Sequence, residues 1–169
     1  MDNGLTDAFV DYVFKLIAED KGIRADLRRA DNPSFEWKVW PVIQQFIKDD
    51  IGIKGKRRAY ALVAAAIAKS GMNENGNIGL GRAFHILEEE KGAVDPDNFP
   101  SRMARLLSCD SQEELEDVMR PVLSLMLSKG LRLDFKSLLD DLVYFNLRKD
   151  EVRIGWAKDY IGSTEEVDG

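Results

Sequence analysis

The C-terminal part of the chain, residues 99–161, contains successive apolar stripes that each repeat with the period of an α-helix. Ser111 and Glu114 have the spacing of a capping box, which predicts that a helix begins there. The stripes are Phe99, Met103, Leu106 and Leu107; Leu115, Val118, Met119, Val122 and Met126; Leu138, Leu139, Leu142 and Phe145; and Val152, Trp156 and Tyr160. Since no helix can bury such a stripe alone, they predict a packed bundle in which Trp156 is buried.

The N-terminal half also divides into amphipathic helices. One spans roughly Leu5–Glu19 and is broken by Gly22, and a flexible loop follows later, over 70–79. Trp37 and Trp40 are spaced as neighbours on one helix face, and we interpret them as core residues because large aromatic side chains usually fill the interior. The predicted fold class is therefore all-α, a compact helical bundle of about eight or nine helices in two small lobes.

The segment 92–98, which contains Gly, Asp and Pro, marks the expected boundary between the lobes. We expect an N-terminal helical lobe over 1–92, a C-terminal lobe of four helices over 98–161 and a disordered tail over 162–169. No run of about 18 apolar residues is present, and the N-terminus does not resemble a signal peptide. The sequence therefore predicts a cytoplasmic protein that does not associate with a membrane.

Few side chains could support catalysis or bind a metal. His85 and Cys109 are the only histidine and cysteine, which excludes a thiolate metal cluster and an internal disulfide and leaves no oriented nucleophile–base pair. Gly76, Gly79 and Gly81 lack the Gly-Lys-Ser/Thr continuation of a phosphate-binding loop. Four aspartates could in principle form a two-metal nuclease site, but we interpret them as surface charges or ion-pair partners. They are Asp134, Asp140, Asp141 and Asp150. We predict no catalytic residue, metal site or cofactor.

The net charge of −6 argues weakly against nucleic acid binding, so such a function must depend on local clusters. Two basic clusters are Lys56, Arg57 and Arg58, and Arg28 and Arg29. The first lies in the first turn of an Ala-rich helix, where the dipole disfavours cations, so a partner anion explains it better than helix stability; a solvated face is the alternative. We expect Arg57 and Arg58 to be exposed, so that changing both to Glu leaves the protein folded. The second cluster either complements a helix dipole or contacts phosphate.

Five segments, in a fixed order, carry a resemblance to a known family. They are LRRA (27–30), GLGRA (79–83), RMARLL (102–107), LLDDLVYFN (138–146) and VRIGWAKDY (152–160). In this order they resemble the CasB family, the small subunits of Cascade, the type I-E CRISPR surveillance complex. The resemblance spans residues 23–161, and its most specific part is the C-terminal pattern Arg-x-x-Trp-Ala-x-x-Tyr.

The resemblance implies a helical protein without enzymatic activity that belongs to a prokaryotic, RNA-guided antiviral complex. Its implied partners are the other Cascade subunits, the CRISPR RNA, target DNA held by its phosphate backbone, and a neighbouring copy of itself placed head to tail. Basic residues would support the guide–target duplex and the displaced strand. Carried over by position, these are Arg28, Arg29, Lys56, Arg57, Arg58, Arg82, Arg102, Arg105 and Arg120. Arg153 is expected to form a structural ion pair instead.

A helical adaptor that binds only protein is the alternative function. The two functions differ in where the arginines point: they line a groove in the first case, and each pairs with a carboxylate in the second. The residues that decide this are Arg28, Arg58, Arg102 and Arg105. Because the net charge repels phosphate at long range, we expect the isolated protein to bind nucleic acid weakly.

Overall fold

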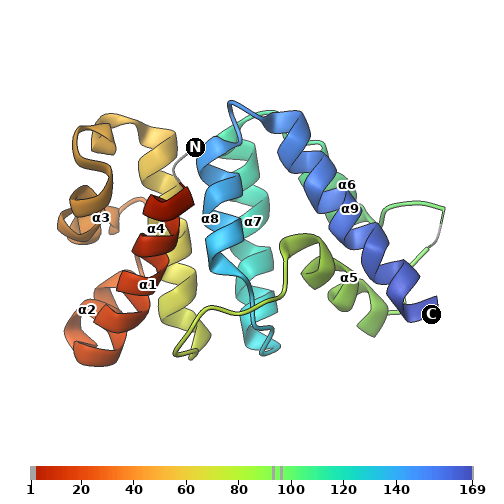
Figure 1. Cartoon of the computed structure of the whole chain (residues 1–169), viewed down its shortest axis with the longest axis horizontal. Coiled ribbons are helices and arrows are strands. Elements are labelled where there is room, and N and C mark those ends of the chain that lie inside the picture. Colours follow the sequence, from red (N-terminus) through yellow and green to blue (C-terminus); the bar gives the residue numbers. More distant parts are fainter. Residues whose placement is uncertain (1–2, 93, 96, 169) are drawn as a thin grey trace. The chain divides into compact units, whose positions relative to one another are not determined.

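The computed structural model describes residues 3–92, 94–95 and 97–168. In this part of the chain there are nine α-helices and no β-strand, which confirms the predicted all-α class (Figure 1). The α-helices are α1 (Asn3–Glu19), α2 (Lys21–Leu27), α3 (Trp40–Ile47), α4 (Lys54–Ser70), α5 (Leu80–Glu90), α6 (Ser101–Leu107), α7 (Gln112–Ser128), α8 (Phe135–Tyr144) and α9 (Lys149–Asp168). Two short 3-10 helices, η1 (Glu36–Val39) and η2 (Lys48–Gly52), flank α3.

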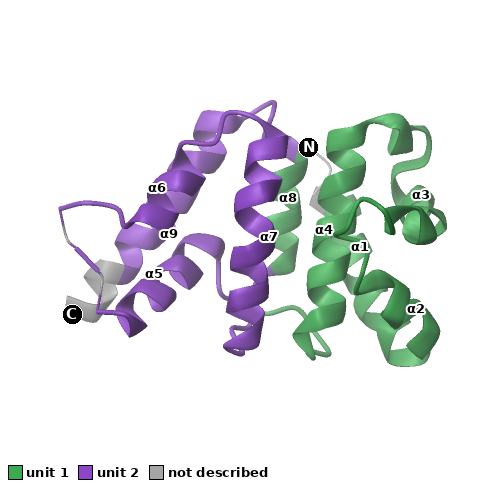
Figure 2. Cartoon of the chain, turned by 180° about the vertical axis from the view of Figure 1, so that it is seen from behind, with its two compact units in different colours: residues 1–76, 135–143 green, residues 77–134, 144–169 purple. Residues whose placement is uncertain are grey.

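The chain divides into two compact units, coloured green and purple in Figure 2. Unit 1 consists of Met1–Gly76 and Phe135–Val143, and unit 2 of Asn77–Asp134 and Tyr144–Gly169. The segment 92–98, predicted to separate two lobes, falls within unit 2, and its residues 93 and 96 lie outside the described part of the chain. The units are therefore discontinuous in sequence. Long-range packing assigns α8 to the unit that holds the N-terminal helices, and local periodicity carries no information about such packing.

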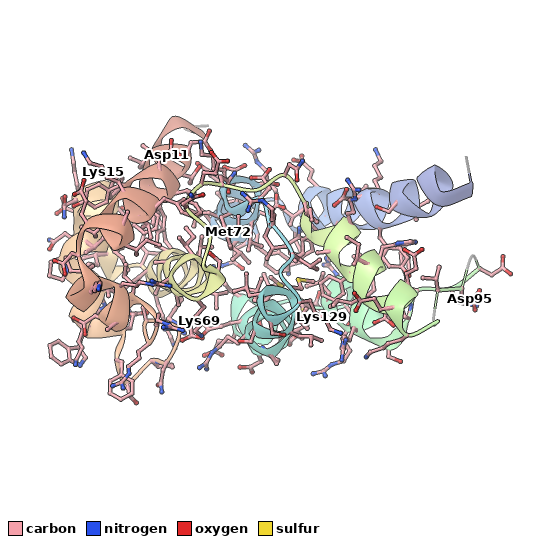
Figure 3. All side chains as sticks on the ribbon, turned by 90° about the horizontal axis from the view of Figure 1, so that it is seen from below. Asp11, Lys15, Lys69, Met72, Asp95 and Lys129 are labelled. Atoms are coloured by element: carbon pink, nitrogen blue, oxygen red, sulfur yellow. The ribbon has the colours of Figure 1, made fainter. Side chains whose placement is uncertain are left out.

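Helix α4 is the centre of unit 1. Its residues from Ala59 to Ala68 are all buried, and many are alanines, whose small side chains let α1 and α2 pack closely. Phe9 of α1 meets Tyr60 of α4 edge to face, with ring centroids 4.7 Å apart. Figure 3 labels Lys69, near the end of α4, whose ammonium lies 2.7 Å from the carboxylate of Asp31.

The junction between α1 and α2 differs from the sequence prediction. Helix α1 ends at Glu19, and the side chain of Asp20 caps α2 by accepting a hydrogen bond from the Ile23 N–H at 3.1 Å. Gly22, predicted to break the helix, lies inside α2. The cap decides the boundary because it satisfies a free N–H at the helix start, whereas a single exposed glycine costs a helix only about 1 kcal/mol.

Close packing of α5 on α9 organises unit 2. A side chain at Gly81 would collide with the backbone carbonyl oxygen of Trp156, so only glycine allows this approach. The carboxylate of Asp159 accepts a hydrogen bond from the backbone N–H of Arg82 at 2.9 Å and so caps the start of α5. Trp156 is buried and stacks on Phe145, which confirms its predicted place in the core.

The predicted start of α7 is confirmed. The Ser111 hydroxyl accepts a hydrogen bond from the Glu114 N–H at 3.1 Å, and α7 begins at the next residue, Gln112. The Glu114 carboxylate accepts from the Asp110 N–H, one residue before the expected donor. Gly130 ends the segment with a φ of 75°, a left-handed conformation that favours glycine.

Helix α9 continues to Asp168, over most of the segment that the sequence assigned to a disordered tail; Gly169 lies outside the described residues. Among the helices described, none combines the length with the apolar composition that a membrane crossing requires.

Candidate nucleic-acid interface

The nine basic residues predicted to contact nucleic acid are distributed over both units. Unit 1 contains Arg28, Arg29, Lys56, Arg57 and Arg58, and unit 2 contains Arg82, Arg102, Arg105 and Arg120. They differ in one respect that the sequence does not show, which is whether the fold places a carboxylate beside them.

In unit 1, two of the three basic residues at the start of α4 pair with one buried carboxylate, that of Glu36 in η1. Arg57 Nε lies 2.8 Å from one Glu36 oxygen, and Arg58 Nη1 lies 3.1 Å from the other. Arg58 is only 6% exposed and also donates a 2.6 Å hydrogen bond to the backbone oxygen of Asp31. The expectation that this arginine is exposed is therefore wrong, because the tertiary fold brings an acidic residue from η1 onto it.

The other members of this cluster are partly exposed but also engaged. Lys56 Nζ lies 2.8 Å from a carboxylate oxygen of Asp50 in η2. Arg57 donates a 2.7 Å hydrogen bond to the backbone oxygen of Ile51 in addition to its pair with Glu36. Any phosphate at this site would have to compete with these internal acceptors.

The two tryptophans beside this cluster lie on the surface, so their interpretation as core residues was wrong. Trp37 is 57% exposed and Trp40 is 41% exposed. Trp37 lies within the 3-10 helix η1, and Trp40 directly follows it. Residues three apart share a face of such a helix, and the buried face of η1 belongs to Glu36 and Val39. The Arg57 guanidinium stacks 5.6 Å from the Trp40 ring centroid, so Trp40 holds a cation against the surface.

Arg28 and Arg29 are both exposed at the C-terminus of α2, where Arg28 is the C-cap residue. The Arg29 guanidinium lies 5.6 Å from the ring centroid of Phe35. Neither side chain forms an ion pair with a residue that the structure describes. Their position fits both alternatives left open by the sequence, favourable interaction with the helix dipole and contact with phosphate.

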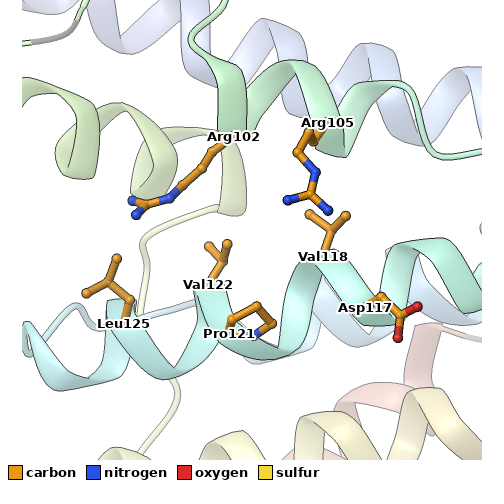
Figure 4. Close-up of a pocket in the computed structure, with 7 residues that line it drawn as sticks. All are labelled: Arg102, Arg105, Asp117, Val118, Pro121, Val122 and Leu125. Carbon is orange, nitrogen blue, oxygen red and sulfur yellow. The ribbon is translucent and has the colours of Figure 1, made fainter.

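In unit 2, Arg102 and Arg105 lie one turn apart on α6 and extend toward α7, where they line a cavity of about 140 Å³ (Figure 4). The residues lining the cavity are Arg102, Arg105, Asp117, Val118, Pro121, Val122 and Leu125. Most of the α7 side is apolar, and in Figure 4 the Asp117 carboxylate points away from both arginines. Two cations thus stand beside an apolar surface.

Neither of these guanidinium groups has an acceptor among the residues that the structure describes. Within the described ranges, Arg102 and Arg105 form no side-chain hydrogen bond and no ion pair, and Arg102 Nη1 is a buried donor without a partner. A buried donor that is left unsatisfied costs about 1–3 kcal/mol, more for a charged group. Arg105 is exposed, so its guanidinium is open to an external anion, and guanidinium forks bind phosphate or carboxylate oxygens well.

The remaining arginines of unit 2 have different environments. Arg82 has an exposed side chain in the first turn of α5, and Arg120 is half-buried on α7.

Arg153 donates a 3.0 Å hydrogen bond to the Leu107 backbone oxygen and lies 3.3 Å from the Asp110 carboxylate. The last result confirms the structural ion pair predicted for Arg153.

The single histidine and cysteine are buried in unit 2. His85 Nδ1 lies 3.8 Å from a Glu89 carboxylate oxygen, and burial raises the pKa of the Cys109 thiol above its ordinary value. A raised thiol pKa lowers the fraction of reactive thiolate. Among the residues described, no three side chains of His, Cys, Asp or Glu are grouped so that they could hold a metal ion.

Comparison with known proteins places this fold and these motifs among CRISPR-associated proteins. The structure of a chain from a "CRISPR RNA-guided surveillance complex" matches with a TM-score of 0.71 and 21% identity, over 98% of this chain and 96% of that one. The crystal structure of a Cse2-family protein from Thermus thermophilus matches with a TM-score of 0.69 and 24% identity, over 93% and 97% of the two chains. No curated protein sequence matches.

A match between the sequence and a family model establishes the family. The family model described as CRISPR-associated protein Cse2 matches residues 23–160. This chain therefore belongs to the Cse2 family, and the resemblance to that family, named CasB above, is confirmed.

Proposed function

We propose that this protein is the non-catalytic small subunit of a type I-E CRISPR surveillance complex and supports the nucleic acids of that complex through their phosphate backbone. The partners in this proposal are the other Cascade subunits, the CRISPR RNA and target DNA, with a second copy head to tail. Membership of the Cse2 family supports the assembly. The observation that carries nucleic acid contact is the pair Arg102 and Arg105, which have no internal anion in the described part of the chain.

The chemistry of this pair suits a polyanion rather than a single small ion. Side chains one turn apart on a helix are neighbours, so both guanidinium groups can approach the same phosphate or successive phosphates. They stand at the rim of a shallow cavity, where the apolar surface of Val118 and Val122 reduces competition from water. Such contacts position a strand and do not identify its bases.

The other predicted residues contribute unequally to this proposal. Exposed arginines at Arg28, Arg29 and Arg82 are available to further phosphates. Lys56, Arg57 and Arg120 are partly buried, and we propose for them a secondary contribution. Arg58 is buried against Glu36, so its contribution is to hold the surrounding surface in place rather than to touch phosphate.

The direct test compares target DNA binding by reconstituted complexes that contain wild-type subunit or the double variant Arg102→Gln, Arg105→Gln. Lys15→Gln, at an exposed lysine of α1, is the matched control. We expect the double variant to weaken binding and to flatten the log–log salt dependence by about 0.7–0.9 for each lost phosphate contact. The loss should be the same for unrelated target sequences. Equal affinity and parallel salt dependence, with the subunit shown to be incorporated, would contradict the proposal.

A protein-only adaptor is the second candidate function, and two observations favour it. The basic cluster of α4 is paired internally, and the exposed tryptophans Trp37 and Trp40 beside it are residue types enriched in protein interfaces. The variant Trp37→Ala distinguishes the two functions. If Trp37 belongs to an adaptor surface, Trp37→Ala lowers the fraction of complexes that contain the subunit. The complexes that do contain the variant subunit then bind target DNA with unchanged affinity.

A further inference from the structure

Helix α9 has apolar residues on two opposite faces. The inner face is buried within unit 2 and consists of Val152, Trp156 and Tyr160. Leu147 is exposed in the turn just before α9, and Ile154 and Ile161 are exposed on the opposite face of the helix. These three side chains are 82%, 54% and 47% exposed. Single exposed apolar residues are common, but Ile154 and Ile161 are seven residues apart and therefore share one side of the helix.

Two charged residues occupy the positions between these apolar side chains. Glu151 and Lys158 are both exposed, and neither forms an ion pair with any residue that the structure describes. At 100° per residue, the four helical positions 151, 154, 158 and 161 fall within a sector of about 80° of α9. We define the outer stripe of α9 as Glu151, Ile154, Lys158 and Ile161 of this sector, together with Leu147 in the turn that precedes the helix.

The outer stripe is complementary to itself when it is reversed. In an antiparallel pair of such helices, a twofold axis near Ile154 and Gly155 places Glu151 of each copy opposite Lys158 of the other. The same axis brings Ile161 of each copy toward the turn that carries Leu147 in the other, so that apolar side chains lie near each other. A parallel pair in register would instead bring like charges together, which is unfavourable. Gly155, beside the axis, has open space where a side chain would stand, and it allows the two helices to approach closely.

We propose that the outer stripe of α9 binds a second copy of this chain as an antiparallel, twofold-symmetric helix pair. The occupant is a second copy because the pattern of charge and apolar side chains complements itself, as an isologous interface requires. The head-to-tail contact of the proposed complex is heterologous and joins two different surfaces, so the α9 pair is a separate contact that does not depend on the proposed function. One helix for each copy makes a small interface, and small interfaces are typically weak and transient.

The first test measures the mass of the full-length protein by sedimentation equilibrium over a range of concentrations. We expect a concentration-dependent dimer for the wild type and its loss in Ile154→Glu, which places like charges at the centre of the stripe. Ile53→Glu is the matched control, since Ile53 in unit 1 is 54% exposed, as is Ile154, and its change should leave the dimer intact. A wild-type protein that is monomeric at every attainable concentration would overturn the proposal, as would a dimer that survives Ile154→Glu.

The second test determines the register of the pair by charge exchange. Glu151→Lys and Lys158→Glu should each weaken association about tenfold, because each change creates two like-charge contacts across the twofold axis. The double variant Glu151→Lys, Lys158→Glu should recover most of the loss, because both opposite-charge pairs are rebuilt. This recovery of association is expected only in the antiparallel arrangement, in which residue 151 of each copy lies opposite residue 158 of the other. Additive losses in the double variant would exclude this register and overturn the proposal.

Other occupants of the stripe would give a different result. If the wild type is monomeric alone, and Ile154→Glu but not Ile53→Glu blocks its incorporation into the assembled complex, the stripe binds another subunit and the second-copy proposal is wrong.

Discussion

Arg57 and Arg58 in unit 1 and Arg102 and Arg105 in unit 2 are both pairs of arginines close together on one helix. They differ in whether the fold places a carboxylate beside them. The first pair holds both oxygens of a buried carboxylate, Glu36, which comes from a different segment of the chain. The second pair borders a cavity, and no carboxylate in the described residues pairs with it. A basic motif therefore predicts an anion, but only the fold shows whether that anion is internal or must come from a partner.

The largest expected effect tests the internal pair. Arg58→Ala should reduce the free energy of unfolding by about 3–5 kcal/mol, because the change leaves the Glu36 carboxylate buried with an incomplete set of partners. Denaturant titration followed by circular dichroism measures this loss. Arg58→Ala combined with Glu36→Gln should be less destabilised than the sum of the two single variants. A loss below about 1 kcal/mol for Arg58→Ala would place this pair among weak surface ion pairs.

A comparable effect is expected in unit 2 from packing instead of charge. Trp156→Ala should cost about 3–5 kcal/mol, because it removes a buried ring stacked on Phe145 and leaves a cavity. We expect this variant to lose nucleic acid binding only to the extent that it is unfolded, and thermal unfolding measures the folded fraction. If Trp156→Ala folds normally and still loses nucleic acid binding, the side chain contacts nucleic acid directly.

A smaller and different effect is expected from the unpaired arginines. Arg105→Ala should change the free energy of unfolding by less than about 0.5 kcal/mol, because the exposed guanidinium has no partner in the described chain to lose. It should weaken target binding by the assembled complex by about 1.5 kcal/mol, or roughly tenfold. Side-by-side unfolding and binding titrations separate the two quantities. A destabilisation like that of Arg58→Ala would remove the contrast between the two pairs.

The smallest effect concerns an exposed aromatic residue. Trp37→Ala should lower the free energy of unfolding by about 1 kcal/mol or less, since Trp37 is largely exposed and the Lys38 ammonium lies 5.9 Å from its ring centroid. Thermal unfolding of Trp37→Ala and Trp156→Ala compares the stability lost at an exposed and at a buried tryptophan of the same protein. A cost similar to that of Trp156→Ala would mean that Trp37 belongs to the core after all.

Local sequence patterns were sufficient for much of the helical architecture. The N-terminal cap of α7 at Ser111 and the buried side chain of Trp156 were both predicted and are present. The cap depends on residues within a few positions along the chain, and the apolar stripe of α9 placed Trp156 on the face that packs inward. The order of the short motifs also identified the family.

Tertiary structure decided the features that depend on residues distant in sequence. Glu36 neutralises Arg58, which lies in a later helix, and the close approach of α9 explains Gly81, for which the sequence offered no role. The 3-10 turn of η1 directs Trp37 outward, although its spacing alone suggested a core residue. The physical reason is common to all three: burial and ion pairing depend on what a side chain meets across space, and periodicity reports only which side chains share a face.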